Sequence, residues 1–299
     1  MRTNARLVLL GKRMFSLKSV RRSVRGLGKT CVRTIDSMRW ERRLGGEIKL
    51  LRDSANVALP DFLILGAPKC GTSWLQGALR QHPRVQIVPD EIEYFSSHID
   101  RPLAWYLAHF EGVDSQRDVA PDQRFVLGEK SAGYCAISIS RIKLVKQLLP
   151  EARLILMVRD PVARHWSHAK RYFSKEKSQK KGYDSLESRQ KLYEFFARTR
   201  RLGEFARAIE NWTRIYPPER LLVISQEAAI ADPELAFRKA LQHINLPYDQ
   251  TPTVMKQVMR QGKNAGPKVS MPDDVKRHLE QMYVEERKRL AGVLETFGA

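Results

Sequence analysis

Short apolar runs alternate with helix-like segments along most of the chain. The runs that predict strands are Phe62–Leu65, Val85–Val88, Arg153–Val158 and Arg220–Ser225. The segments that predict helices are Thr72–Arg80, Glu234–Ile244 and Pro272–Phe297. Uninterrupted apolar runs are typical of parallel strands buried on both faces, and their alternation with helices predicts helices on each side of the sheet. We therefore predict one α/β domain, a three-layer fold with a central parallel sheet flanked by helices.

A glycine-rich loop joins the first predicted strand to the helix that follows it. The loop runs from Gly66 to Gly71 and contains Lys69, and the helix begins at Thr72 and Ser73. Backbone N–H groups at a helix start are unpaired and lie at the positive end of the helix dipole, so they attract phosphate. Lysine adds a charge and the two hydroxyls add donors. We interpret the segment as an anion-binding loop, with an ordinary glycine-rich turn as the alternative.

The position of the lysine argues against a nucleoside triphosphate. In the pattern G-x-x-x-x-G-K-[ST] the lysine follows the loop and reaches the β- and γ-phosphates. Here Thr72 follows Gly71, and Lys69 lies earlier, inside the loop. The shift predicts a shorter anion, one phosphate with a further group attached.

A second strand-to-helix junction has a cation at the end of its strand. Arg159 follows the apolar run, Asp160 can cap the next helix, and Pro161 fits the first helical position. Ser167 lies about two turns further on. Two anion sites on one sheet imply a ligand with two separated phosphates. The alternative is an arginine–aspartate pair that only closes the helix start.

Together the two junctions resemble the sulfotransferases that use 3'-phosphoadenosine 5'-phosphosulfate (PAPS). The family motif PK-x-GT-[ST]-W-L is present as Pro68, Lys69, Gly71, Thr72, Ser73, Trp74 and Leu75, and R-D-P-x-x-R-x-x-S as Arg159, Asp160, Pro161, Arg164 and Ser167. The resemblance covers Asp61 to Phe297 and implies a P-loop-type fold. It implies that the 5'-phosphosulfate is bound by Lys69, Cys70, Gly71, Thr72, Ser73 and Trp74. It also implies that Arg159 and Ser167 bind the 3'-phosphate.

The segments between these motifs resemble the heparan-type and bacterial carbohydrate branch of that family. They are Asp90–Phe95, similar to E-x-x-[FY]-F, Trp105–Leu107, similar to W-Y-L, and Gly128–Tyr134, similar to EK-[ST]-P-x-Y with Ala132 in place of proline. The resemblance implies sulfuryl transfer to an acceptor hydroxyl, with a carbohydrate or glycolipid as the expected acceptor.

The resemblance also implies roles for individual residues in that reaction. Glu91 would be the base, Lys69 would stabilise the leaving phosphate, and Lys130 would orient the base or the acceptor. Glu93 is a rival base, although strand alternation would face it away if the extended conformation continued. His98 is a second rival.

The C-terminal third is expected to contact the adenine. Lys263 and Asn264 resemble a basic loop of the same branch that closes over the nucleotide, and a plain linker before the last helix is the alternative. No histidine, cysteine or acidic pattern in the sequence marks a metal site, so we expect no metal.

Composition agrees with one enzyme domain and adds a basic N-terminal extension. The chain has 299 residues, 42% of them hydrophobic, and a net charge of +20. Residues 1–35 contain seven arginines and three lysines and no acid, so we predict an extension over residues 1–55 and a domain over residues 56–299. The extension suits an anionic membrane surface, a transit peptide or a solvated arm.

The remaining features of the sequence concern the cellular location of the protein and its alternative functions. Leu7–Leu10 is too short to span a bilayer, and three scattered cysteines favour a reducing compartment, so we expect a cytoplasmic protein, peripheral at most. A basic cluster at Lys170–Lys181 is either an acceptor-binding rim or a solvated helix face. A P-loop small-molecule kinase and a basic nucleic-acid-binding protein are the alternative functions. The first lacks its lysine after the loop, and for the second no aromatic-basic reading module is evident.

Overall fold

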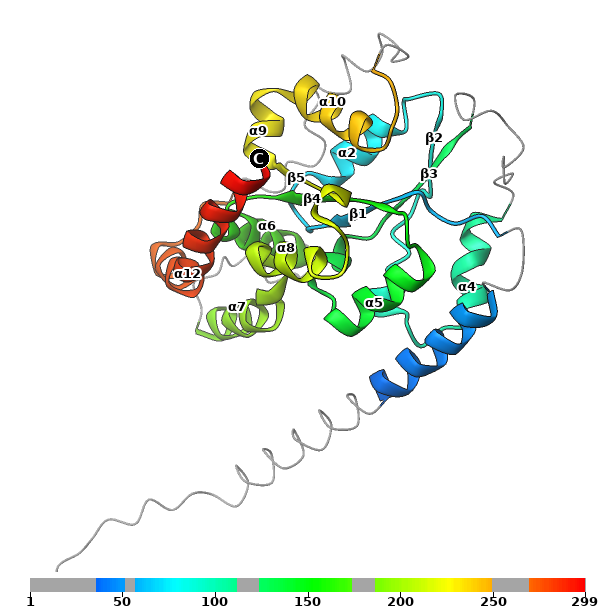
Figure 1. Cartoon of the computed structure of the whole chain (residues 1–299). Coiled ribbons are helices and arrows are strands. Elements are labelled where there is room, and N and C mark those ends of the chain that lie inside the picture. The colour runs from blue at the N-terminus through cyan, green and yellow to red at the C-terminus, as the bar shows by residue number, and fades with distance from the viewer. Residues whose placement is uncertain (1–35, 52–56, 112–123, 174–185, 249–268, 299) are drawn as a thin grey trace, which may run out of the picture.

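A central parallel sheet organises the molecule (Figure 1). The computed structural model describes residues 36–51, 57–111, 124–173, 186–248 and 269–298. The sheet has five strands in the order β2-β3-β1-β4-β5. They are β1 (Phe62–Gly66), β2 (Val85–Ile87), β3 (Val126–Lys130), β4 (Arg153–Val158) and β5 (Leu221–Ser225). Every pairing between neighbouring strands is parallel, which confirms the predicted sheet.

Helices cover both faces of this sheet. Those named in the text are α2 (Thr72–Leu79), α3 (Tyr94–Ser97), α4 (Leu103–Leu107), α5 (Ile139–Leu148), α6 (Pro161–Phe173), α7 (Leu186–Thr199), α8 (Phe205–Thr213), α9 (Gln226–Ala231), α10 (Pro233–His243) and α12 (Asp273–Phe297). Short 3-10 turns include η1 (Ala108–Phe110), η2 (Ala132–Ala136), η4 (Arg200–Gly203) and η5 (Pro218–Arg220). In Figure 1, α2, α9 and α10 lie on one face and α5, α6 and α8 on the other, so the fold has three layers.

The strands form where the apolar runs predicted them. All five residues of β1 are buried, and in β4 only the first residue, Arg153, is partly exposed. The strands predicted at Val85–Val88 and Arg220–Ser225 are confirmed to within one residue. β3 was not predicted because Gly128, Glu129 and Lys130 interrupt its apolar pattern.

The order of the strands places the functional edge. β1 lies between β3 and β4, and the chain leaves β1 toward one side of the sheet and later returns on the other. In open parallel sheets the crevice beyond the carboxyl ends at such a reversal is where ligands bind. The loops after β1, β3 and β4 therefore meet at one place.

A helix over residues 36–51 packs against the body of the fold. Leu44 and Ile48 are buried in the main core, and the Arg43 guanidinium donates to the carbonyl oxygens of Ile99 and Asp100 at 3.0 and 2.9 Å. This part of the predicted extension thus contacts the domain. Residues 1–35 lie outside the described part, and the boundary at residue 56 stays a prediction. Within the described residues, no helix combines the length and apolar character needed to cross a membrane.

Candidate active site at the carboxyl edge of the sheet

The loop after β1 turns sharply into α2. Lys69 and Gly71 have positive φ angles of 71° and 95°, and the first turn closes through Trp74 N–H and Leu75 N–H, which donate to the Gly71 carbonyl at 2.9 and 3.1 Å. No side chain caps this start of α2. The backbone N–H groups of Thr72 and its neighbours therefore lie at a helix start suited to an anion, as the sequence predicted.

The two predicted anion sites lie next to each other. The Arg159 guanidinium donates to the Lys69 carbonyl oxygen at 3.3 Å, which ties the end of β4 to the loop after β1. Burial lowers the pKa of the Lys69 ammonium, and the positive charges of Arg171, Arg159 and Lys170 lower it further. Like charges gathered in this way repel one another. A bound anion would relieve that repulsion.

Helix α6 presents a row of polar groups toward the same cations. Asp160 caps the helix, because its carboxylate accepts a hydrogen bond from Ala163 N–H at 2.8 Å. Ser167 is half-buried, and helical spacing puts it on one face with Lys170 and Arg171. The cap and the helix start at Pro161 confirm the predicted local structure. Only the first residues of the basic cluster at Lys170–Lys181 are described, and they act on Lys69.

Arg164 is a buried cation with no hydrogen-bond partner in the part of the chain that the structure describes. Its side chain is fully buried, and none of its three guanidinium nitrogens has a hydrogen-bond acceptor among the described residues. Burial lowers its pKa, the Tyr283, Cys70 and Cys135 groups oppose that shift, and Arg159 adds to it. A buried charge without an anion is costly. Together with Lys69 and Arg159, it makes the region fit a polyanionic ligand.

An ion pair joins the loop after β2 to the end of β3. Lys130 Nζ lies 2.9 Å from Glu91 Oε1, the lysine side chain is 7% exposed, and the glutamate is 38% exposed. The second oxygen, Oε2, accepts from Ala132 N–H at 3.2 Å. Burial by itself raises the pKa of Glu91, but the hydrogen bond and charge of Lys130 outweigh it, so the pKa lies below its ordinary value. Glu91 is therefore an ionised, accessible carboxylate at neutral pH.

Glu93 lies beside Glu91 rather than away from it. Its backbone is left-handed, with φ of 51°, so the extended conformation ends before it and strand alternation does not apply. Its carboxyl accepts from Gly133 N–H at 2.9 Å and from the Ser96 hydroxyl. Burial raises the pKa of Glu93 to about 7, and the neighbouring Glu91 raises it as well. The two neighbouring carboxyl groups therefore influence each other's pKa.

Glu129 and its neighbour Lys130 lie on opposite faces of β3. Strand alternation turns it inward, where it is fully buried and accepts hydrogen bonds from the hydroxyls of Tyr106, Ser131 and Tyr134 at 2.6, 2.7 and 2.7 Å. Burial raises its pKa. Ser131 Oγ also accepts from Glu93 N–H at 2.8 Å, so the buried carboxyl helps fix the loop that holds Glu93.

A contact that the sequence analysis missed anchors the segment before Glu91. Gln76, on α2, donates through Nε2 to the carbonyl oxygens of Val88 and Pro89 at 3.1 and 3.2 Å. The anion-binding loop and the Glu91 loop are therefore held by one helix. A glutamine on the buried face of a predicted amphipathic helix was the available signal, because a buried amide needs partners.

The other predicted site residues are less uniform. Thr72 is buried, Ser73 is exposed, and Trp74 is half-buried. Cys70 is fully buried, burial raises the pKa of its thiol to about 12, and its N–H donates to the Ala67 carbonyl within the loop. The Cys70 thiol is therefore neutral at physiological pH and shielded from a ligand.

Three further predictions concern His98, the segment expected to contact the nucleotide, and metal binding. His98 is exposed, with its ring 5.5 Å from that of Trp105. Lys263 and Asn264 lie outside the described residues. No cluster of histidine, cysteine, aspartate or glutamate in the described part could hold a metal ion.

Comparison with known proteins identifies what the chain is similar to. The model described as "Sulfotransferase family" matches residues 60–250. Human heparan sulfate glucosamine 3-O-sulfotransferase 3A1 is 30% identical over 194 residues, which are 63% of this chain and 45% of that protein. The match thus spans less than half the length of that relative. Membrane-associated sulfotransferase kil1 of Dictyostelium discoideum is 33% identical over 112 residues, 37% of this chain and 22% of that protein.

A solved structure agrees in fold. The crystal structure of a sulfotransferase from Alicyclobacillus acidocaldarius superimposes with a TM-score of 0.60 at 22% identity, over 80% of this chain and 97% of that one. This likeness concerns the α/β architecture alone, and it confirms the P-loop-type three-layer fold expected from the motifs.

Proposed function

The chain belongs to the sulfotransferase family, and from this premise we propose that it transfers a sulfuryl group from PAPS to a hydroxyl of a carbohydrate-containing acceptor. The observation that supports it most is the Lys130–Glu91 pair at 2.9 Å, at the same sheet edge as the cation-rich loop around Lys69. A proton acceptor and an anion-binding site side by side are what such a transfer needs.

The donor fits the charges of the described residues. The Lys69 loop and the start of α2 would hold the 5'-phosphosulfate through backbone N–H groups, and Arg159 and Ser167 would hold the 3'-phosphate. The buried Arg164, which has no hydrogen-bond partner among the described residues, adds positive charge behind them. PAPS supplies the activated sulfuryl group. We propose that Lys263 and Asn264 contact the nucleotide, on the strength of the motif alone.

Glu91 is proposed as the general base. Its pKa lies below the ordinary value, so it is ionised at neutral pH, and its exposed fraction of 38% leaves it open to an acceptor hydroxyl. It would take the hydroxyl proton as the oxygen attacks sulfur, which typically accelerates a reaction about 100- to 10,000-fold. Lys130 would hold the Glu91 carboxylate in place through the ion pair with Oε1.

Lys69 is proposed to stabilise the leaving phosphate. Negative charge develops on the bridging oxygen as the sulfur–oxygen bond breaks, and a partly buried ammonium stabilises such charge more strongly than one in water. Burial and three neighbouring cations lower its pKa, so an arriving anion restores its preference for the charged form.

The acceptor class rests on the names of relatives and on the motifs. The human relative is named as a heparan sulfate glucosamine 3-O-sulfotransferase, and the segments around Glu91 and Lys130 resemble motifs of the carbohydrate branch. A sugar hydroxyl, on a polysaccharide or a glycolipid headgroup, is therefore the acceptor that we propose.

Transfer of radioactive sulfate from labelled PAPS tests the proposal. The protein is incubated with heparan-type polysaccharide, glycolipid and small-metabolite extracts, and labelled products are separated. Glu91→Gln should abolish most of the labelling, whereas the neighbouring exposed Asp90→Asn should leave it intact. Labelling of nothing, or equal labelling by Glu91→Gln, would refute the assignment.

A second proposal concerns the basic extension. We propose that residues 56–299 form the sulfotransferase domain and that residues 1–35 contact an anionic membrane surface, because ten cations and no acids attract anionic lipid. One relative is named as membrane-associated. Deleting residues 1–35 keeps the helix over residues 36–51 and should reduce salt-sensitive sedimentation with anionic vesicles. Unchanged sedimentation would leave a solvated or targeting arm.

A further inference from the structure

The opposite, amino edge of the sheet has a row of charged residues. Parallel strands all start at one edge, and here each start has a charged side chain in or just before it. The residues are Arg84 before β2, Arg124 before β3, Asp61 before β1, Arg153 in β4 and Arg220 before β5. Neighbouring strands lie about 4.8 Å apart, so these side chains are close. Four cations and one anion at one edge make it strongly basic.

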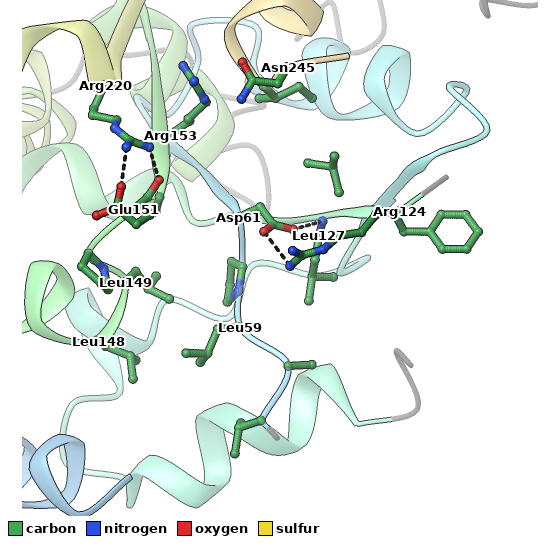
Figure 2. Close-up of a pocket in the computed structure, with 18 of the residues that line it drawn as sticks. Leu59, Asp61, Arg124, Leu127, Leu148, Leu149, Glu151, Arg153, Arg220 and Asn245 are labelled. Atoms are coloured by element: carbon green, nitrogen blue, oxygen red, sulfur yellow. Dashed lines mark hydrogen bonds and ion pairs between the residues drawn. The ribbon is translucent and has the colours of Figure 1, made fainter. Parts of the chain in front are cut away.

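A cavity of about 560 Å³ opens at this edge (Figure 2). All five of the charged residues line it, with Glu151 as a second carboxylate. In Figure 2, Arg153 and Arg220 lie on one side, and Leu59, Leu148 and Leu149 lie on another. The cavity therefore offers cations and an apolar wall to one occupant.

Most of the charges are already paired. Asp61 lies 3.5 Å from Arg124 and accepts from Leu127 N–H at 2.9 Å. Arg84 donates to the Arg124 carbonyl oxygen at 3.1 and 3.0 Å. Arg220 forms an ion pair with Glu151. These contacts account for three of the four arginines.

Arg153 is the exception. No hydrogen bond or ion pair to its guanidinium is found among the described residues, although it is partly buried in a cavity wall. The parallel register pairs Leu154 with Leu221, so Arg153 and Arg220 stand side by side at the starts of their strands. Burial lowers the pKa of Arg153, and the charge of Arg220 lowers it further. Of these two adjacent guanidinium groups, that of Arg220 pairs with Glu151.

We propose that this cavity binds a small organic anion, whose sulfate, phosphate or carboxylate head lies against Arg153 and Arg220 and whose short apolar body lies against Leu59, Leu148 and Leu149. The head supplies the counter-charge that Arg153 lacks, and guanidinium groups recognise such heads with paired hydrogen bonds. The three leucines line the same cavity and give the apolar body a surface to lie against. The site is separate from the carboxyl edge and does not depend on the proposed function.

Calorimetric titration of the full chain with hexyl sulfate tests the proposal. Saturating 3'-phosphoadenosine 5'-phosphate is present throughout to occupy the donor site. We expect one saturable site, and at least about tenfold weaker binding of inorganic sulfate and of hexanol, which provide only the head or only the tail. Hexyl phosphate and hexanoate should compete, which identifies the preferred head.

Variants of Arg153 connect the binding to the residue. Arg153→Gln should weaken hexyl sulfate binding about ten- to hundredfold, because a charge-assisted contact is lost. Arg153→Lys should keep part of it, and Arg80→Gln, at an exposed arginine on the end of α2, should keep all of it. Thermal unfolding verifies that each variant is folded.

Two results would overturn the proposal. One is hexyl sulfate binding that is absent, or as weak as that of sulfate and hexanol, in the folded parent chain. The other is equal binding by Arg153→Gln and the parent. A case of the first result is binding that appears only when the nucleotide is omitted, which would place hexyl sulfate in the donor site.

Discussion

The two edges of the sheet balance positive charge in opposite ways. At the carboxyl edge, helix starts and cations point to the same region, because α2 and α6 begin just after β1 and β4. At the amino edge, helices end: α5 stops at Leu148 shortly before β4, and the Arg220 guanidinium donates to the Glu151 carbonyl just beyond that helix end. Helix starts repel cations and helix ends attract them.

The two edges differ in whether their cations have partners within the protein. Cations at the amino edge find carbonyl oxygens and carboxylates within the protein, with Arg153 as the exception described above. At the carboxyl edge, burial lowers the pKa of the Lys69 ammonium, and the charges of Arg171, Arg159 and Lys170 lower it further. An external anion would balance the positive charge around Lys69. Charge alone therefore does not mark a ligand site, because most cations of the amino edge already have partners within the protein.

The largest effect should come from Lys69→Ala. We expect turnover to fall about 100- to 1,000-fold, as it does when a group that stabilises transition-state charge is removed. Binding of 3'-phosphoadenosine 5'-phosphate should weaken far less, because the lysine acts on charge that develops late. Steady-state rates and calorimetry measure the two quantities. Arg153→Gln is the matched control at the other edge, and its turnover should stay within about twofold of the parent.

Equal losses in turnover and in binding would assign Lys69 to ground-state phosphate only. A comparable loss in Arg153→Gln would mean that the two edges are not independent.

Arg159 and Arg153 flank the two ends of the same strand, β4. Arg159→Gln should weaken the binding of nucleotides that have a 3'-phosphate about ten- to hundredfold and leave the binding of plain adenosine 5'-phosphate unchanged. Arg153→Gln should change neither nucleotide but should lose hexyl sulfate. The affinities of both variants for both nucleotides, measured by competition, give the answer. Discrimination that survives Arg159→Gln would remove it from the 3'-phosphate site.

The strands and the first loops of the site could be predicted from the sequence because their signals are local. An apolar run followed by glycine, lysine and hydroxyl residues specifies a strand, a turn and a helix start within a few positions. β4 and the Asp160 cap formed as predicted for the same reason. β3 was missed because Glu129 and Lys130 at its end are charged although both are buried, which conflicts with the apolar pattern.

The pairing of groups within the site could not be predicted, because it depends on contacts between distant segments. The left-handed backbone at Glu93 turns its carboxyl toward Gly133, and no rule of strand alternation contains that turn. Similarly, Glu129 and Lys130 are adjacent in sequence but face opposite sides of β3. The resemblance implied roles for Glu91 and Lys130, and their geometry required the structure.

A smaller effect should come from Gly133→Ala. A Cβ at this position would lie 2.4 Å from Glu93 Oε2, so the carboxyl must move away from its partners while the backbone stays. We expect turnover to fall about tenfold with nucleotide affinity unchanged, since sub-ångström displacement of a catalytic pair lowers rate. Gly77→Ala on α2, where a Cβ meets nothing within 4 Å, should leave turnover intact and raise stability. Parent-like turnover in Gly133→Ala would show that the Glu93 carboxyl does not matter.

The smallest effect is expected from a comparison of two carboxyl groups with similar pKa values, Glu93 at the carboxyl edge of the sheet and Glu286 elsewhere. Burial raises the pKa of both Glu93 and Glu286 to about 7, and Glu286 lies on α12, where it accepts from Ala206 N–H. An acid whose folded pKa is raised contributes stability that is complete below its unfolded pKa of 4.5 and is lost as pH rises toward 7. Glu93→Gln and Glu286→Gln should therefore both reduce the loss of thermal stability between pH 4.5 and pH 7.

Only Glu93→Gln should change the dependence of turnover on pH. Below pH 7 the protonated Glu93 can donate a hydrogen bond to Glu91 and weaken it as a base, and above pH 7 the ionised Glu93 makes Glu91 a stronger base. The other charged or ionisable groups nearby are Lys130, the Arg141 side chain near Ser96 and the buried Cys135 thiol. The parent's turnover should thus rise about threefold through pH 7, and in Glu93→Gln the amide donates at every pH, so the rise should vanish. Glu286→Gln should retain it. A rise that persists in Glu93→Gln, or disappears in Glu286→Gln, would show that the Glu91–Glu93 pair does not set the pH profile.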